Sequence, residues 1–235
     1  MLNARISGTV LAVALMGGGP ALAEKYEQNF DFRIAGIKAG EVSIKGETGA
    51  NGYVADARVT STGLIGRIAD FYYVGTSRGA ITGGGRPVPK LFEVTSRSPR
   101  AERETRIEFE GGTPVSVSVE PPRSTSPDPA SQAGTLDPIS AGFAVLKDGP
   151  VEGICNKQVD IFDGSRRSRI ALAPARESGG DLVCDGRYTR LEGEENTFSS
   201  SDYGFQIVYS EDGGYARLQR IETKTKFGAA TVERR

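Results

Sequence analysis

Residues 30–34 have the sequence Phe-Asp-Phe-Arg-Ile, in which apolar and charged side chains alternate strictly. A period of two places Phe30, Phe32 and Ile34 on one face of an extended strand and the charged side chains on the other. A strand with one apolar and one charged face is typical of an antiparallel sheet that covers a core. The stretch therefore predicts a β-strand, and the same pattern recurs along most of the chain.

Similar alternating segments follow one another at short, regular spacing, with turn sequences between them. Asn51-Gly52 is a strong hairpin signal, and Gly111-Gly112 and Asp163-Gly164 mark further turns. About a dozen short strands at this spacing predict a large antiparallel sheet. We therefore expect an all-β fold, with the sheet curved into a half-barrel, a barrel or a β-spiral. Residues 24–235 are expected to form a single antiparallel β domain.

One segment of that domain has a different composition. Residues 121–134 hold four prolines together with Ser, Thr and Asp, and almost no apolar side chain. Such a Pro/Ser-rich segment buries little and is broken by proline, which predicts an exposed loop.

The helix signals are concentrated after this loop. Asp137 suits the N-cap of a helix and Pro138 suits its first position, while Ile139, Phe143 and Leu146 share one face. We expect this one short helix to pack against the concave face of the curved sheet. A second segment with helical spacing, which predicts a turn or a short helix, contains Leu64, Ile65 and Ile68.

Residues 1–23 have the features of a secretory signal peptide. Arg5 precedes a short apolar run at residues 10–16, and Ala21-Leu22-Ala23 forms a cleavage signature before Glu24. An apolar run this short cannot cross about 30 Å of hydrocarbon, and no later segment is apolar enough to be transmembrane. We therefore expect export to the periplasm, with cleavage after Ala23.

Cys155 and Cys184 are the only cysteines. An even number of cysteines in an exported chain predicts a disulfide bond. The pair lacks the C-x-x-C spacing of redox-active thiols, and two thiolates without histidine make a poor zinc site. We expect a structural bridge, which would stabilise the fold by about 3.5 kcal/mol for a loop of about 30 residues.

Charge and the absence of histidine restrict the function classes. The formal net charge is −1, from 29 basic and 30 acidic side chains, so nothing indicates nucleic-acid binding. A chain without histidine lacks the commonest general base, the commonest metal ligand and every Ser-His or Cys-His pair. We therefore expect no catalytic residue, no metal and no cofactor, and predict that the protein is not an enzyme.

Two charged segments resemble sites at first inspection. Asp160 and Asp163 precede three arginines, but the turn sequence between them favours a hairpin with a solvated basic face. The acidic run at Glu192, Glu194 and Glu195 lacks the spaced oxygen ligands of a calcium loop. The arginines of the first segment are Arg166, Arg167 and Arg169. A hydrolase that works through Asp or Glu alone remains an alternative, and it would need two carboxyl groups about 5–10 Å apart across a cleft.

Several short motifs resemble the exported bacterial family known as domain of unknown function (DUF) 3108. The resemblance rests on Asp137-Pro138-Ile139-Ser140-Ala141 at the start of the helix, then Cys155, then Val-Asp-Ile-Phe-Asp-Gly at residues 159–164. Residues 36–42, 61–64 and 227–228 extend it over nearly the whole of residues 24–235, whereas Ala216 replaces a proline that is frequent in the family. The resemblance implies a periplasmic β protein whose curved sheet wraps a helix, in the manner of lipoprotein carriers and envelope-integrity proteins. It implies no reaction.

Large curved sheets enclose apolar space unless side chains fill it. We therefore predict a non-enzymatic cell-envelope protein that binds an apolar ligand, such as a lipid or an acyl chain, or an envelope protein partner. The first alternative is a structural or interaction protein with a filled core, and the second is the carboxylate-dependent hydrolase. The candidate ligand-binding residues are Leu64, Ile65, Ile68, Ile139, Phe143 and Leu146.

Overall fold

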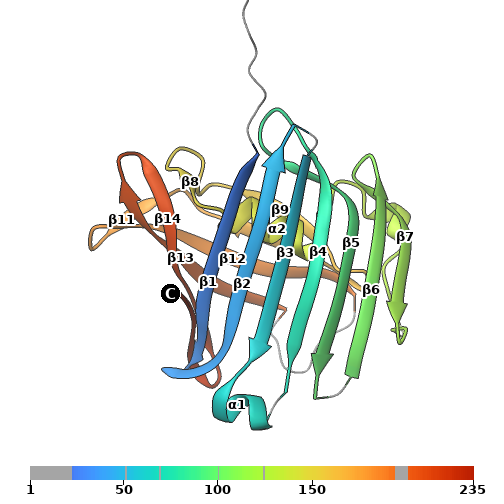
Figure 1. Cartoon of the computed structure of the whole chain (residues 1–235), viewed down its shortest axis with the longest axis horizontal. Coiled ribbons are helices and arrows are strands. Elements are labelled where there is room, and N and C mark those ends of the chain that lie inside the picture. Colours follow the sequence, from blue (N-terminus) through green and yellow to red (C-terminus); the bar gives the residue numbers. More distant parts are fainter. Residues whose placement is uncertain (1–22, 51, 69, 100, 124, 194–200) are drawn as a thin grey trace, which may run out of the picture.

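The structure is a computed structural model that describes residues 23–50, 52–68, 70–99, 101–123, 125–193 and 201–235. All of the predicted signal peptide except Ala23 lies outside these residues. The described strands form one large sheet (Figure 1). None of the helices in the described part of the chain has the length and hydropathy that a membrane crossing requires.

The amino-terminal half of the sheet is a meander. Its strands are β1 (Glu24–Ile34), β2 (Ile37–Gly49), β3 (Gly52–Ser61), β4 (Tyr72–Ile81), β5 (Pro87–Ser98), β6 (Ala101–Glu110) and β7 (Thr113–Glu120). The helices are α1 (Gly63–Ile68), η1 (Pro129–Ser131) and α2 (Pro138–Leu146).

The carboxy-terminal half follows α2. Its strands are β8 (Gly149–Pro150), β9 (Gln158–Phe162), β10 (Arg166–Leu172), β11 (Arg176–Ser178), β12 (Asp181–Gly193), β13 (Asp202–Asp212), β14 (Tyr215–Thr225) and β15 (Gly228–Arg234). The short strands β8 and β11 pair only with β14 and β12, and the sequence pattern does not predict them.

The two halves of the sheet join where β1 pairs with β15. The spatial order is β7-β6-β5-β4-β3-β2-β1-β15-β14-β13-β12-β10-β9, and these neighbouring strands pair in antiparallel fashion. In the register between β1 and β15, Phe30 lies opposite Arg234 and Phe32 opposite Val232. The predicted all-β class with one large antiparallel sheet is confirmed, and the sheet is not closed into a full barrel.

The sheet nevertheless curves far enough for its two ends to approach each other. The turn between β9 and β10 lies against β6 and β7, since a Cβ atom on Gly164 would come within 3.1 Å of Thr105 Cγ2 and Val119 Cγ2. Gly164 also has a φ of +87°, which a side chain would strain. Nearby, Leu136 forms a parallel bridge with Ile161 of β9. Only glycine therefore fits at this close approach between the two ends of the sheet.

The helix α2 lies inside this curve and contacts β3, β4, β5 and β9 (Figure 1). It begins as the sequence predicts, because Asp137 Oδ1 accepts hydrogen bonds from the backbone N–H groups of Ile139 and Ser140, at 2.9 Å each. Its residues divide between two buried clusters of the core. Ala141 and Val145 belong to the first cluster, with residues of β1, β9, β10 and β12–β14, whereas Ile139 and Phe143 belong to the second.

Residues 121–134 run along the outside of the molecule beside β7. Most of their described side chains are exposed, in line with the composition. The exception is Gln132, which is fully buried and whose Nε2 donates to Ser131 Oγ at 2.6 Å and to Glu192 Oε2 at 3.3 Å. The end of this loop is therefore fixed to the sheet before α2 begins.

Candidate functional site

The amino-terminal end of α2 holds a sealed polar cluster. Asp137 Oδ2 accepts hydrogen bonds from Ser140 Oγ and, at 2.7 Å, from Ser77 Oγ of β4. Tyr53 OH of β3 lies 2.5 Å from Ser140 Oγ and 3.3 Å from Ser77 Oγ. All four side chains are buried, so water and substrates do not reach them. The cluster therefore attaches α2 to β3 and β4 and has no open face for a reaction.

Burial dominates the electrostatics of this cluster. It raises the pKa of Asp137, although the hydrogen bonds from Ser140, Ser77 and the backbone act in the opposite direction. Burial, with the nearby Asp137 charge, also raises the pKa of Tyr53 to about 12. The cluster thus disfavours negative charge at both groups.

Replacing Asp137 by Asn tests this description. A raised pKa in the folded state means that the folded protein binds a proton more readily than the unfolded chain does. The stabilising contribution of Asp137 is therefore fully present below about pH 4, the unfolded value, and is lost as the pH rises through the folded value. We expect urea unfolding between pH 4 and pH 8 to show that Asp137→Asn gains stability relative to wild type as the pH rises.

Asp137→Ala is the matched variant that removes the hydrogen bonds as well. It leaves two backbone N–H groups and two hydroxyl groups without their acceptor, and it should cost about 2–4 kcal/mol near pH 4. This cost should shrink as the pH rises, because wild type itself then loses the contribution of Asp137. A difference between wild type and Asp137→Asn that is constant across this pH range would contradict the assigned ionisation.

The other end of α2 is held by a second carboxylate. Asp148 Oδ1 accepts from Gln28 Nε2 and from the Leu218 N–H, both at 2.8 Å, and its Oδ2 accepts from Arg234 Nη2 at 2.7 Å. These three partners belong to β1, β14 and β15. The two ends of α2 are therefore attached to different halves of the sheet, Asp137 to the β3–β4 side and Asp148 to the strands around the β1–β15 pair.

The structure brings together some of the candidate ligand-binding residues but not all of them. Ile139 and Phe143 pack side by side in the second cluster, and the Phe143 ring lies 5.5 Å from the rings of Tyr26 and Tyr53. Leu146 is half-buried and packs against the first cluster. The side chains of Leu64, Ile65 and Ile68 lie outside the described part, and their helix α1 contacts β2 and β3. Ligand binding by these six residues stays a prediction.

A pocket of about 400 Å³ opens beside the end of α2. Phe143 and Ile154 form part of its apolar wall, and Lys147 and Lys157 lie on its polar side. Lys147 pairs with Glu24 at 3.2 Å, and Lys157 Nζ donates to the Ala144 carbonyl at 3.2 Å. Burial lowers the pKa of Lys157. Both lysines therefore have structural partners.

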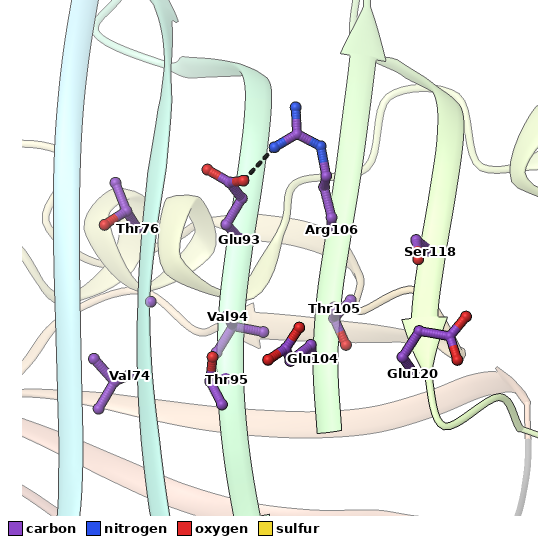
Figure 2. Close-up of a pocket in the computed structure, with 11 residues that line it drawn as sticks. Val74, Thr76, Glu93, Val94, Thr95, Glu104, Thr105, Arg106, Ser118 and Glu120 are labelled. Atoms are coloured by element: carbon purple, nitrogen blue, oxygen red, sulfur yellow. Dashed lines mark hydrogen bonds and ion pairs between the residues drawn. The ribbon is translucent and has the colours of Figure 1, made fainter. Parts of the chain in front are cut away.

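A second pocket, of about 440 Å³, lies on the surface of β4–β7 (Figure 2). Glu93 and Arg106 form an ion pair there, and Glu104 lies directly opposite Glu120 in the strand register. Figure 2 shows the carboxylates of Glu104 and Glu120 directed away from each other. They are neighbours on one exposed surface, so they lack the arrangement across a cleft that the hydrolase alternative requires.

The charged segments of the sequence have structural partners. Asp160 accepts from Arg169 Nε at 2.6 Å and from Arg167 Nη2 at 2.8 Å, and these arginines, Arg169 first, hold the pKa of Asp160 below its usual range. Asp163 Oδ1 accepts from the N–H groups of Ser165 and Arg166 in the turn between β9 and β10. This is the hairpin that the turn sequence predicts. Glu194 and Glu195 of the acidic run lie outside the described residues. Within the described ranges, no three Asp, Glu or Cys side chains are grouped so as to hold a metal ion.

The predicted disulfide is present. Cys155, in the segment between α2 and β9, is bonded to Cys184 of β12, and both side chains are buried. The bridge attaches the chain that leaves α2 to the middle of the carboxy-terminal half of the sheet.

Sequence reasoning missed the strand residues that hold α2. Tyr53, Ser77, Gln28 and Arg234 come from four different strands, and none was a candidate. Their only local signal is a polar side chain at an inward position of an alternating strand. That signal marks Ser77 in β4, but it does not identify the partner.

These features define a class: a β-barrel-like protein in which one curved antiparallel sheet wraps a short helix that is attached at both ends. Within that class, the family described as protein of unknown function (DUF3108) matches residues 25–179. The chain therefore belongs to the DUF3108 family, as its motifs predicted.

The fold has a solved counterpart. A crystal structure of a β-barrel-like protein of domain of unknown function DUF1849, from Brucella abortus, is similar with a TM-score of 0.50 and 12% sequence identity. The similarity covers 89% of this chain and 94% of that chain. At this identity it supports the architecture alone. No curated protein matches the sequence.

Proposed function

We propose that this protein is a non-enzymatic component of the bacterial cell envelope that binds an apolar ligand, such as an acyl chain, on its concave face. The observation that carries the proposal is a set of half-buried apolar side chains on the strands around the β1–β15 pair. These residues are Phe32, Val42, Phe205, Ile221 and Val232.

These side chains continue the buried core outward. Along one row of the register, Phe32 lies opposite Val232, Val232 opposite Ile221, and Ile221 opposite Ile207, which is fully buried. The row therefore leads from a fully buried side chain in the core to half-buried ones. Each square ångström of apolar surface removed from water contributes about 25 cal/mol, so an acyl chain that covered this row would be bound by the hydrophobic effect.

In the other half of the interior, around the second core cluster, side chains fill the core, as the filled-core alternative predicts. Phe143, Tyr53 and Phe162 are buried there, and α2 occupies the space between them. The proposed ligand therefore lies over β1, β2 and β13–β15, and α2 is a structural element that holds the curvature of the sheet.

Two further observations support an exported, non-enzymatic role. The disulfide needs an oxidising compartment to persist, which agrees with the signal peptide predicted at residues 1–23. The polar cluster around Asp137 is sealed, and the Asp160 carboxylate is bonded to two arginines. The Asp137 cluster therefore has no access to a substrate, and the Asp160 carboxylate is engaged in structural ion pairs.

The test is to purify the protein from the periplasm of a Gram-negative host and to analyse the extracted small molecules by mass spectrometry. We expect a co-purifying lipid or fatty acid. Val232→Gln should weaken the binding of a fluorescent fatty acid about tenfold, because it places an amide in the proposed apolar row. Val115→Gln on β7 is the matched control, since Val115 is already 53% exposed. If wild type carries no lipid and binds no probe, the structural protein with a filled core is the better description.

A further inference from the structure

Two turns at one end of the sheet expose large apolar side chains. Ile37 follows the turn between β1 and β2, and Phe227 lies in the turn between β14 and β15. Their exposed fractions are 59% and 67%, the two highest of any large apolar side chain in the described part of the chain. The two turns are neighbours, because the Ala35 N–H donates to the Ala229 carbonyl at 2.8 Å.

The helix α1 lies at the same end. It contacts the beginning of β2, and the Thr62 N–H just before it donates to the Ala39 carbonyl at 3.0 Å. Figure 1 shows α1 and the turn between β1 and β2 together at the lower end of the sheet. We refer to residues 34–38, 62–68 and 224–229 together as the lower rim.

The lower rim carries charge of one sign. Its three segments contain four basic residues and no acidic residue. Lys38 forms ion pairs with Asp31 of β1 at 2.9 Å and with Glu41 of its own strand, β2, at 2.8 Å. The other three are Arg67, Lys224 and Lys226. The Lys226 ammonium lies 5.1 Å from the centre of the Phe227 ring, so the exposed ring and a cation are adjacent.

This combination fits a bilayer surface better than a protein surface. Amphipathic groups with an apolar body and a cationic end partition to the membrane interface, where basic side chains meet anionic headgroups. A protein partner is recognised through a contiguous apolar patch with a mixed polar rim, whereas the lower rim presents two apolar tips in segments whose charged residues are all basic.

We infer that the lower rim docks on an anionic lipid bilayer, with Ile37 and Phe227 entering the headgroup region and Arg67, Lys224 and Lys226 on the anionic headgroups. The inference rests on other residues than the proposed ligand face, and it does not require that a ligand be bound there.

Sedimentation with lipid vesicles tests the inference on the full mature protein. We expect binding to vesicles of phosphatidylethanolamine and phosphatidylglycerol, binding at least about tenfold weaker to phosphatidylcholine alone, and further weakening at high salt. The double variant Ile37→Ser/Phe227→Ser should lose about tenfold in affinity for the anionic vesicles, and Lys224→Glu should weaken binding in the same direction.

The matched control is Val54→Ser/Val115→Ser, which changes two exposed apolar side chains that belong to β3 and β7, outside the lower rim. It should bind the anionic vesicles as wild type does. The inference is overturned if wild type does not bind them, or if the two double variants bind equally. The fluorescent fatty acid separates this outcome from the proposed function, because Ile37→Ser/Phe227→Ser should keep its affinity for that probe while Val232→Gln should not.

Discussion

Replacement of Phe143 by Ala should lower the free energy of unfolding by about 3–5 kcal/mol. The Phe143 side chain is only 5% exposed, and its ring packs against the rings of Tyr26 and Tyr53 in the second core cluster. Truncation removes the apolar contacts and leaves a cavity between α2 and the sheet. Urea unfolding followed by far-ultraviolet circular dichroism measures the change.

Phe227→Ala is the matched control for this prediction. It removes the same side chain from a position that is 67% exposed, so its effect on stability should stay within about 0.5 kcal/mol. A small loss in Phe143→Ala, accompanied by a changed affinity for a fluorescent fatty acid, would instead favour the sequence-based prediction that Phe143 lines a ligand site.

Removing the disulfide should have an effect of similar size. The double variant Cys155→Ala/Cys184→Ala frees a loop with a sequence separation of 29 residues, and the expected loss is about 3.5 kcal/mol. Dithiothreitol should destabilise wild type by a similar amount and leave the double variant unchanged. Free thiols in native protein isolated from the periplasm would show that the bridge does not form in the cell.

Local sequence patterns predicted the elements of this fold because they act over a few residues. Alternation identified β1, and Asp137 and Pro138 identified the start of α2. Residues 63–68 formed the short helix that their spacing indicated. The cysteine pair was predicted because the chain contains only two cysteines.

Such local patterns could not predict which strands pair when they are distant in sequence. Nothing within β1 indicates that its second neighbour is β15, about two hundred residues later. For the same reason Asp137 was recognised as a helix cap, but its bonds to Ser77 and, through Ser140, to Tyr53 were not. The end of α2 shows the same limit, because Asp148 binds three groups that are distant in sequence. The hydrogen-bond partner of a buried polar side chain on a strand can be identified only when the positions of both side chains are known.

The pairing of β1 with β15 also determines when folding can finish. A chain that is synthesised from its amino terminus delivers β1 first, and one edge of β1 stays unpaired until residues 228–234 arrive. An unpaired strand edge is a template for aggregation with other chains. The charged residues Glu27, Asp31 and Arg33 line the outward side of this strand, and charges on an open edge oppose such pairing. The side chains that later form surface ion pairs therefore also oppose aggregation of β1 while the chain is still incomplete.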